Sequence, residues 1–173
     1  EVARWYNDRV EQHGEQLRRV CRYVKGWRDY YWSNCDGPSS VSLMILVARN
    51  FVLRLRRDDL ALEDAARAIY EGIDQDLYEP GIDGGETDFN RLDATQRKVA
   101  KAQAKDLLDQ LSNSRHYASL NLARDAIRNV RSQFGPRIAD DTSFIELDDS
   151  VDQVRRSSAA AVAPPLVGSN QSG

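Results

Sequence analysis

Three positive charges with helical spacing precede a pair of serines in this sequence. Arg18, Arg22 and Lys25 recur at intervals of four and three residues, and Ser39-Ser40 follows after a short loop. On a helix of 3.6 residues per turn the three cations fall within about 60° of one another. Such a row suits phosphate, as do the hydroxyls and free amides of a serine-headed helix start. The residues that we expect at a triphosphate are Arg22, Lys25, Ser39 and Ser40.

The same row of charges has a simpler interpretation. Long Arg and Lys side chains often lie on a solvated helix face with their stems packed against apolar neighbours. Two features favour a ligand instead. Gly26 stands within the helix, where glycine costs about 1 kcal/mol relative to alanine, which suits the close approach of another group to the backbone. The serine-headed start of the next helix is the second feature, since a helix N-terminus attracts anions.

Helices must position these residues, and apolar periodicity predicts the first of them over residues 15–32. Its expected buried face consists of Leu17, Val20, Cys21, Val24 and Trp27. The charged row lies about 120° from this face, so that a buried flank would hold it in place. Gly37-Pro38 stops this helix, and a serine side chain at 39 or 40 can cap the first amides of the next one.

The rest of the sequence predicts an all-α fold, a helical bundle of about five to six helices with an extended C-terminal tail. The expected helical segments are 3–13, 15–32, 41–55, 62–73, 93–111 and 118–134. Gly14 marks a break after the first. The segment 41–55 is apolar nearly all round, as in a central buried helix. Residues 76–90 are expected to form a loop, and Gly135-Pro136 to end the last helix.

Composition excludes several classes of protein. The 173 residues are 41% hydrophobic and 29% charged, which indicates one soluble globular domain. No apolar run approaches the roughly 20 residues of a membrane span, so no membrane association is expected. A net charge of −3 provides no general field that would recruit DNA. Two cysteines and two histidines give neither a disulfide framework nor a zinc cluster, which fits a reduced cytoplasmic protein.

Three stretches resemble the helical C-terminal lobe of bacterial cyclic GMP–AMP synthase/DncV-like nucleotidyltransferases. They read EQLRRVCRYVKGWRDYYW, GPSSVSLMILVARNFV and NVRSQFGPRI, and the resemblance covers about residues 1–147. These enzymes of anti-phage defence join nucleoside triphosphates such as ATP into cyclic di- or trinucleotides, between a catalytic lobe and this helical lobe. The resemblance implies that Lys25 binds the donor triphosphate and that Ser40, beside Ser39, donates to a phosphate oxygen. Animal relatives have a base-stacking aromatic residue where this chain has Val41, so stacking would come from the other lobe.

The catalytic signature of the family is not found in this sequence. That signature is a Gly-Ser turn followed by Asp-x-Asp on a strand, with a later third acid, and its carboxylates hold two Mg²⁺ ions. The segment Asp74-Gln75-Asp76 is interpreted as a solvated helix end, since side chains two residues apart on a helix diverge by about 200°. The resemblance therefore implies a Mg²⁺-binding catalytic lobe upstream of Glu1. We expect no catalytic residue in this chain, and no activity from it alone.

Residues 148–173 are expected to form a separate tail after the helical lobe 1–147. The last residues, SSAAAVAPPLVGSNQSG, are small, contain prolines and carry no charge, which is typical of a flexible segment. In some operons of the family an E1–E2-like enzyme of the ubiquitin-transferase type takes the C-terminal residue of the synthase through a thioester and conjugates it to a target. The resemblance then implies that Gly173 is conjugated. The apolar anchors for that partner would be Val162, Leu166 and Val167.

One function from a different class stays open at this point. The chain could be a non-catalytic helical module that binds another protein, with the charged row as an ordinary solvated face. A Gly-Ser turn followed by Asp-x-Asp upstream of Glu1 would decide for the enzyme, and the absence of such a stretch would decide for the module.

Overall fold

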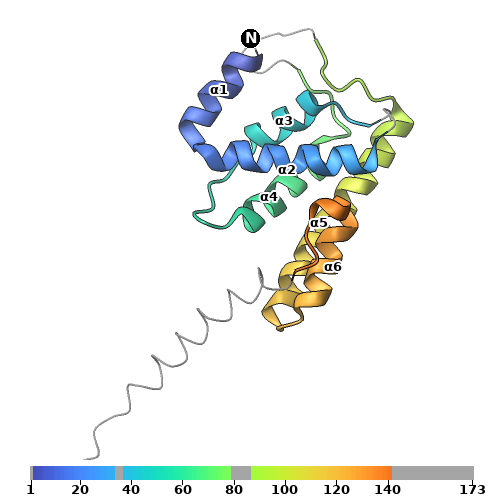
Figure 1. Ribbon diagram of the computed structural model, residues 1–173. Coiled ribbons are helices and arrows are strands. Elements are labelled where there is room, and N and C mark those ends of the chain that lie inside the picture. The colour runs from blue at the N-terminus through green and yellow to red at the C-terminus, as the bar shows by residue number, and fades with distance from the viewer. Residues whose placement is uncertain (1, 34–36, 79–86, 142–173) are drawn as a thin grey trace, which may run out of the picture.

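The computed structural model describes residues 2–33, 37–78 and 87–141, and in these ranges the fold is all-α. The elements are α1 (Val2–His13), α2 (Glu15–Tyr31), α3 (Ser40–Arg49), α4 (Asp58–Gly72), α5 (Ala94–Ser119), α6 (Ala123–Phe134) and a 3-10 turn, η1 (Gly135–Arg137). Figure 1 shows α2 crossing in front of α3 and α4, with α5 and α6 running off as an antiparallel pair. The prediction of a helical bundle is confirmed.

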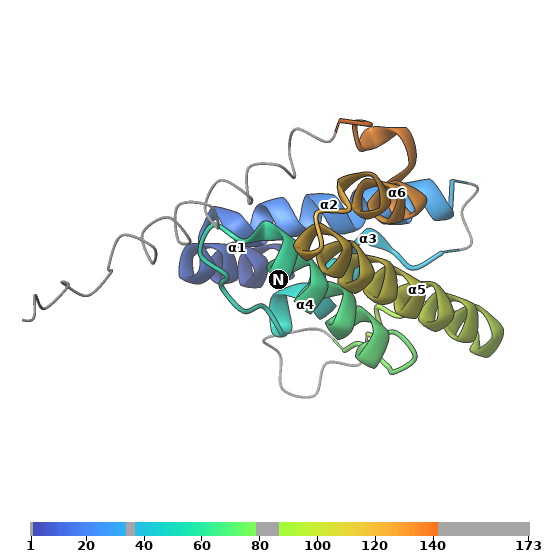
Figure 2. The same cartoon turned by 90° about the horizontal axis from the view of Figure 1, so that it is seen from below.

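Helix α2 is the centre of the arrangement because it packs against α1, α3, α4 and α6. Seen from below, α1 lies along its N-terminal half and α6 along its C-terminal half (Figure 2). The predicted apolar face is confirmed, with only Cys21 partly exposed. Its fully buried members are Leu17, Val20, Val24 and Trp27. Each of the aliphatic side chains contributes about 1.5–3 kcal/mol on burial and the larger indole of Trp27 contributes more, so this face makes α2 a rigid support for the residues on its other face.

Glycines end two helices where the sequence predicts an end. Gly14 separates α1 from α2 with φ of +73°, and Gly135 follows α6 with φ of +62°. Both values lie in the left-handed region that glycine adopts without strain. A Cβ at Gly135 would also lie 2.3 Å from the ring of Tyr30. The close contact between Tyr30 and Gly135 therefore requires glycine and brings the end of α6 onto α2.

The expectation of a buried helix over 41–55 is wrong in its second half. α3 stops before Asn50, whose side-chain amide donates to a carbonyl of the last turn at 2.9 Å and so competes with the helix for it. Gln16 of α2 then bonds the backbone of Arg54, accepting from its N–H at 2.8 Å and donating to its C=O at 2.7 Å. These bonds favour a loop over a helix, and Leu55 is left 80% exposed.

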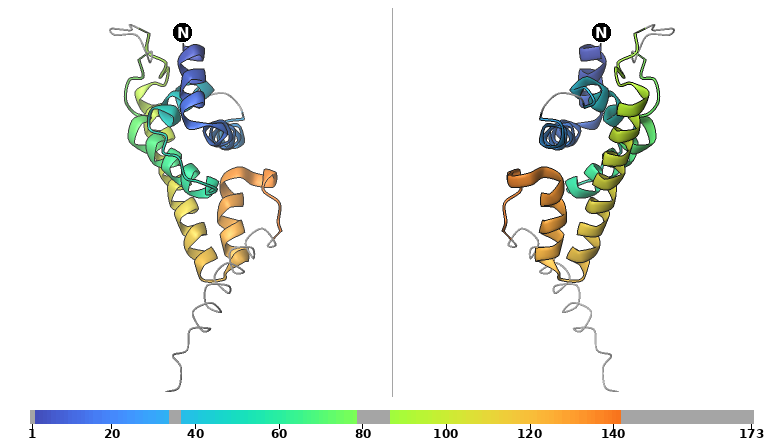
Figure 3. Two further views of the ribbon diagram at one scale, coloured as in Figure 1. Left: turned by 90° about the vertical axis from the view of Figure 1, so that its left-hand side faces the viewer. Right: turned by 90° about the vertical axis from the view of Figure 1, so that its right-hand side faces the viewer.

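The other boundaries shift because of tertiary contacts. α4 already begins at Asp58 rather than at 62, and α5 continues past the expected end at 111. The last turns of α5 pack along α6, where Ser114 donates to the carbonyl of Ala126 at 2.9 Å. Figure 3 shows this pair projecting beyond the other helices.

The sequence suggested that Asp74 and Asp76 are solvated acids at a helix end, but in the structure both form ion pairs. Asp74 pairs with Lys101 at 2.6 Å, and Asp76 pairs with Arg97 at 2.8 Å, so both hold the end of α4 against α5. Of the expected loop over 76–90, residues 79–86 lie outside the described ranges, and Tyr78 and Asp88 on either side of them form an isolated antiparallel bridge.

Some expectations fall on residues that the structure does not describe. The proposed boundary at 147 and the tail 148–173 lie outside the described ranges, as do the four tail positions Val162, Leu166, Val167 and Gly173. Within the described ranges, no helix combines the length and apolar character needed to cross a membrane.

A polar cluster joins α2 to the start of α4. Asp58 accepts hydrogen bonds from Arg19 Nε at 2.7 Å and Nη2 at 2.9 Å, and from the side-chain amide of Gln16 at 2.9 Å. The bond from Arg19 is the main cause that lowers the pKa of Asp58 from 3.8 to about 2. The ionised carboxylate is therefore favoured in the folded state.

We expect Asp58→Asn to reduce the free energy of unfolding by about 1 kcal/mol at pH 7, allowing for partial solvent screening. The folded-state pKa of Asp58 is depressed, so its contribution is complete above pH 4 and is lost as pH falls toward 2. The difference between wild type and variant should shrink over that window in urea titrations. Asp109→Asn is the matched control, because Asp109 forms only an exposed pair within α5, worth no more than about 0.5 kcal/mol. A difference that stays constant down to pH 2 would contradict the assignment.

Candidate functional site

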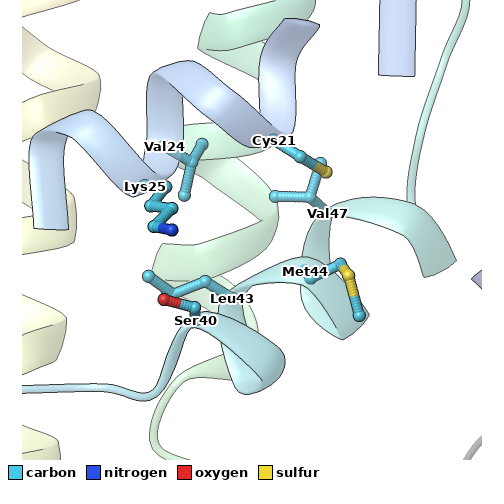
Figure 4. Close-up of a pocket in the computed structure, with 7 residues that line it drawn as sticks. All are labelled: Cys21, Val24, Lys25, Ser40, Leu43, Met44 and Val47. Carbon is cyan, nitrogen blue, oxygen red and sulfur yellow. The ribbon is translucent and has the colours of Figure 1, made fainter. Parts of the chain in front are cut away.

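A small pocket lies where the middle of α2 faces the start of α3. Its lining residues are Cys21, Val24, Lys25, Ser40, Leu43, Met44 and Val47. In Figure 4 the amino group of Lys25 points across the gap toward the end of α3 that carries Ser40. The cavity measures about 20 Å³, which is room for about one water molecule. A larger ligand would lie across its mouth, with Lys25 on one side and Ser40 on the other.

The charged row lies on the solvent side of α2, as the helical geometry predicts. Arg18, Arg22 and Lys25 are all exposed. Arg18 pairs with Glu15 at 2.7 Å. Within the described residues, Arg22 and Lys25 make neither a hydrogen bond nor an ion pair. An anion could engage these two cations without first breaking a contact in the protein.

Ser39 caps α3. Its Oγ accepts from the N–H of Ser42 at 3.0 Å and lies 2.6 Å from the Ser42 hydroxyl. The Ser42 hydroxyl itself donates to the carbonyl of Phe89 at 2.6 Å. Since each hydroxyl has one proton, Ser39 must donate to Ser42. The proton of Ser39 is thus engaged inside the protein, and its role is to fix the first turn of α3.

Ser40 differs from its neighbour in every respect that matters for a ligand. It is the first residue of α3, it is exposed, and its hydroxyl has no hydrogen-bond partner among the described residues. The N–H groups of Ser40 and Val41 lie in the first turn, where no intrahelical acceptor is available. Together with the positive end of the helix dipole they offer donors to an anion.

The sequence predicted that a group would approach the backbone of Gly26 closely, and in the structure that group is the side chain of Arg137. Arg137 of η1 donates to the carbonyl of Gly26 at 2.7 Å, and its Cδ lies 4.0 Å from where a Cβ would stand. Gly26 therefore contributes to the contact between α2 and η1. It gives no support to the idea that a ligand approaches the backbone there.

The thiol of Cys21, which lines the pocket, and the phenol of Tyr6 beside it carry no charge at neutral pH. Burial raises the pKa of the Cys21 thiol, although a hydrogen bond with Tyr6 opposes that rise. Burial also raises the pKa of Tyr6, and the bond to Cys21 adds to it. Lys25 is consequently the single charged group among the lining residues. Sequence reasoning missed Tyr6, because no local pattern shows that α1 reaches the helix two turns after Gly14.

The pocket does not suit a metal ion. None of its lining residues is a carboxylate, whereas Mg²⁺ prefers carboxylate and other oxygen ligands. In the described ranges there is also no group of three or more His, Cys, Asp or Glu side chains that could hold a metal. What this arrangement can do is bind an anion through a lysine, a hydroxyl and backbone amides.

Sequence comparison relates the chain to a group of bacterial enzymes. Residues 14–147 match the family described as cyclic GMP-AMP synthase, C-terminal domain. A cyclic GMP-AMP synthase of Escherichia coli (strain TW11681) is 28% identical over 144 residues, which is 79% of this chain and 32% of the relative. One from Vibrio cholerae serotype O1 is 51% identical over 43 residues, which is 25% of this chain and 10% of the relative. The chain therefore spans about a third of the length of the first of these relatives.

Solved structures share the fold. The crystal structure of Vibrio cholerae DncV cyclic AMP-GMP synthase in complex with the linear intermediate 5′ pppA(3′,5′)pG superposes with a TM-score of 0.70 at 22% identity, covering 82% of this chain and 37% of that chain. The 3′-deoxy GTP bound form of Escherichia coli DncV gives 0.69 at 24% identity, covering 82% and 38%. The helical arrangement described above is thus similar to one part of these enzymes.

Replacing Ser39 and Ser40 by alanine, one at a time, should change the stability of the protein to different extents. Ser39→Ala removes the cap of α3 and should reduce the free energy of unfolding by about 1 kcal/mol. Ser40→Ala should leave stability within about 0.5 kcal/mol, because its hydroxyl bonds nothing in the described protein. Thermal unfolding of both variants beside wild type provides the measurement. An equal loss of stability in the two would contradict the division of roles.

Proposed function

This chain belongs to the family of cyclic GMP-AMP synthase C-terminal domains, and from that premise we propose that it is the nucleotide-binding helical lobe of a cyclic oligonucleotide synthase. The observation that carries the proposal is Lys25 facing the start of α3 across an otherwise uncharged pocket. In two solved relatives the bound molecules are the linear intermediate 5′ pppA(3′,5′)pG and 3′-deoxy GTP. A nucleoside triphosphate is therefore the ligand that we assign to this pocket.

Each residue of the site has a distinct role in this proposal. Lys25 donates to the triphosphate from α2, and Ser40 donates its hydroxyl from α3. The first amides of α3 add neutral donors that need no counter-charge. Arg22 lies one turn before Lys25 and makes neither a hydrogen bond nor an ion pair with the described residues, so it extends the contact to an outer phosphate. Ser39 holds the helix start through Ser42 rather than touching the nucleotide.

The chemistry itself is assigned to a second lobe. The match covers 32% of a relative named as a cyclic GMP-AMP synthase, and the lining of the pocket includes no carboxylate that could hold Mg²⁺. We therefore propose that the metal is bound by a catalytic lobe outside this sequence and that this chain alone is inactive. Formation of a cyclic product by the 173-residue chain with ATP, GTP and Mg²⁺ would contradict that statement.

Lys25→Met in the intact synthase should raise the KM for the nucleotide by about 10- to 100-fold, because a charge-assisted hydrogen bond contributes about 1.5–3 kcal/mol. Steady-state product formation at sub-saturating nucleotide measures it. Lys98→Met is the matched control, since Lys98 is an exposed lysine of α5 outside the pocket, and it should change KM by less than about twofold. Equal KM values in wild type and Lys25→Met would remove the triphosphate assignment.

Two further proposals rest on the family resemblance of the sequence. The synthase would act in the cytoplasm in anti-phage defence, and an E1–E2-like enzyme would conjugate it through Gly173, held by the apolar residues Val162, Leu166 and Val167. These four residues lie outside the described ranges, so the support is the sequence alone.

Deleting Gly173 should abolish a covalent adduct with that partner on denaturing gels, while nucleotide binding persists. An adduct that survives the deletion would contradict the assignment.

A further inference from the structure

Helices α2 and α3 carry the two halves of the site, and directional contacts between them are few among the described residues. Their contact is mainly apolar, through residues such as Val24 and Val47. Apolar packing is strong but not directional. In the described part of the chain, a single hydrogen bond connects α2 with residues 37–49, and it comes from Arg28: its Nε donates to the carbonyl of Pro38 at 3.0 Å.

This bond lies close in sequence to residues of both halves of the site. Arg28 lies three residues after Lys25 and therefore on the same side of α2. Pro38 directly precedes the cap Ser39, so the carbonyl that Arg28 holds belongs to the peptide plane leading into the first turn of α3. Pro38 is fully buried, and its carbonyl is held by a guanidinium that is itself oriented by Asp29 at 2.9 Å.

We propose that Arg28 is a positioning residue for the triphosphate: its bond to Pro38 sets the separation between Lys25 and the donors at the start of α3. The inference rests on the proposed function of the pocket. Arg28 acts through Pro38 and does not touch the nucleotide. The bond from Ser42 to Phe89 holds the far side of the same turn, so that loss of Arg28 lets the turn move relative to α2 without unfolding α3.

Two substitutions of Arg28 test this in the intact synthase. Arg28→Met keeps the apolar stem and removes every donor, and it should weaken binding of a non-hydrolysable GTP analogue about tenfold in calorimetry. Arg28→Lys restores a donor near the carbonyl and should recover binding to within about threefold of wild type. The matched control is Arg49→Met, because Arg49 also donates to a backbone carbonyl, that of Tyr78 at 2.6 Å, but stands at the opposite end of α3 from Ser40. It should lower the melting temperature without changing affinity.

The dependence of affinity on salt separates positioning from direct contact. Each cation that touches the phosphates adds to the slope of log affinity against log salt concentration. Lys25→Met should reduce that slope, whereas Arg28→Met should weaken binding with the slope unchanged. A reduced slope in Arg28→Met would make Arg28 a direct ligand and overturn the inference, as would unchanged affinity. Failure of the wild type to bind the analogue would instead overturn the proposed function of the pocket.

Discussion

The burial of one face of α2 is the interaction on which the rest of the structure depends. Trp27, the largest side chain of that face, is fully buried, and an indole of this size contributes about 5 kcal/mol when it leaves water. Its ring nitrogen has no hydrogen-bond partner among the described residues, which costs about 1–3 kcal/mol. The apolar gain exceeds that penalty. Helix α2 can therefore carry Arg22 and Lys25 without partners, because its place in the bundle does not depend on them.

Hydrogen bonds at the start of α3 give the adjacent residues Ser39 and Ser40 different roles. A helix start needs a side-chain acceptor for its free amides, and Ser39 supplies it. The Ser39 hydroxyl then donates to the Ser42 hydroxyl, which donates to the backbone carbonyl of Phe89, so each proton is used once. Ser40 does neither: it is exposed, and its hydroxyl has no partner in the described part of the chain. A rigid cap beside a free hydroxyl is what an anion site requires, since the donor is already in place before the ligand arrives.

Much of this could be predicted from the sequence where the cause is local. Apolar spacing predicted the buried face of α2, and Gly135 predicted the end of α6 correctly. The errors have distant causes. The extent of α3 depends on Gln16, which bonds Arg54 from 38 positions away, and the partner of Gly26 is Arg137, 111 positions away. No periodicity encodes such contacts. Spacing brought Lys25 and Ser40 together, and the sequence predicted a serine cap at 39 or 40, but the structure decided between the two serines and revealed the bond from Ser42 to Phe89, 47 positions away.

The size of the pocket bears on how such a lobe would work. A cavity of about 20 Å³ cannot enclose a triphosphate, so in the proposed complex the ligand stays open to water on the side away from α2 and α3. The Coulomb attraction between a cation and an anion is weak in water because the surrounding dielectric screens it. The attraction between the same two charges is several times stronger once solvent is excluded. A second lobe that closes over the ligand would supply that exclusion. On this argument the isolated chain would bind nucleotide weakly, and full affinity would require the proposed second lobe to close over Lys25 and Ser40.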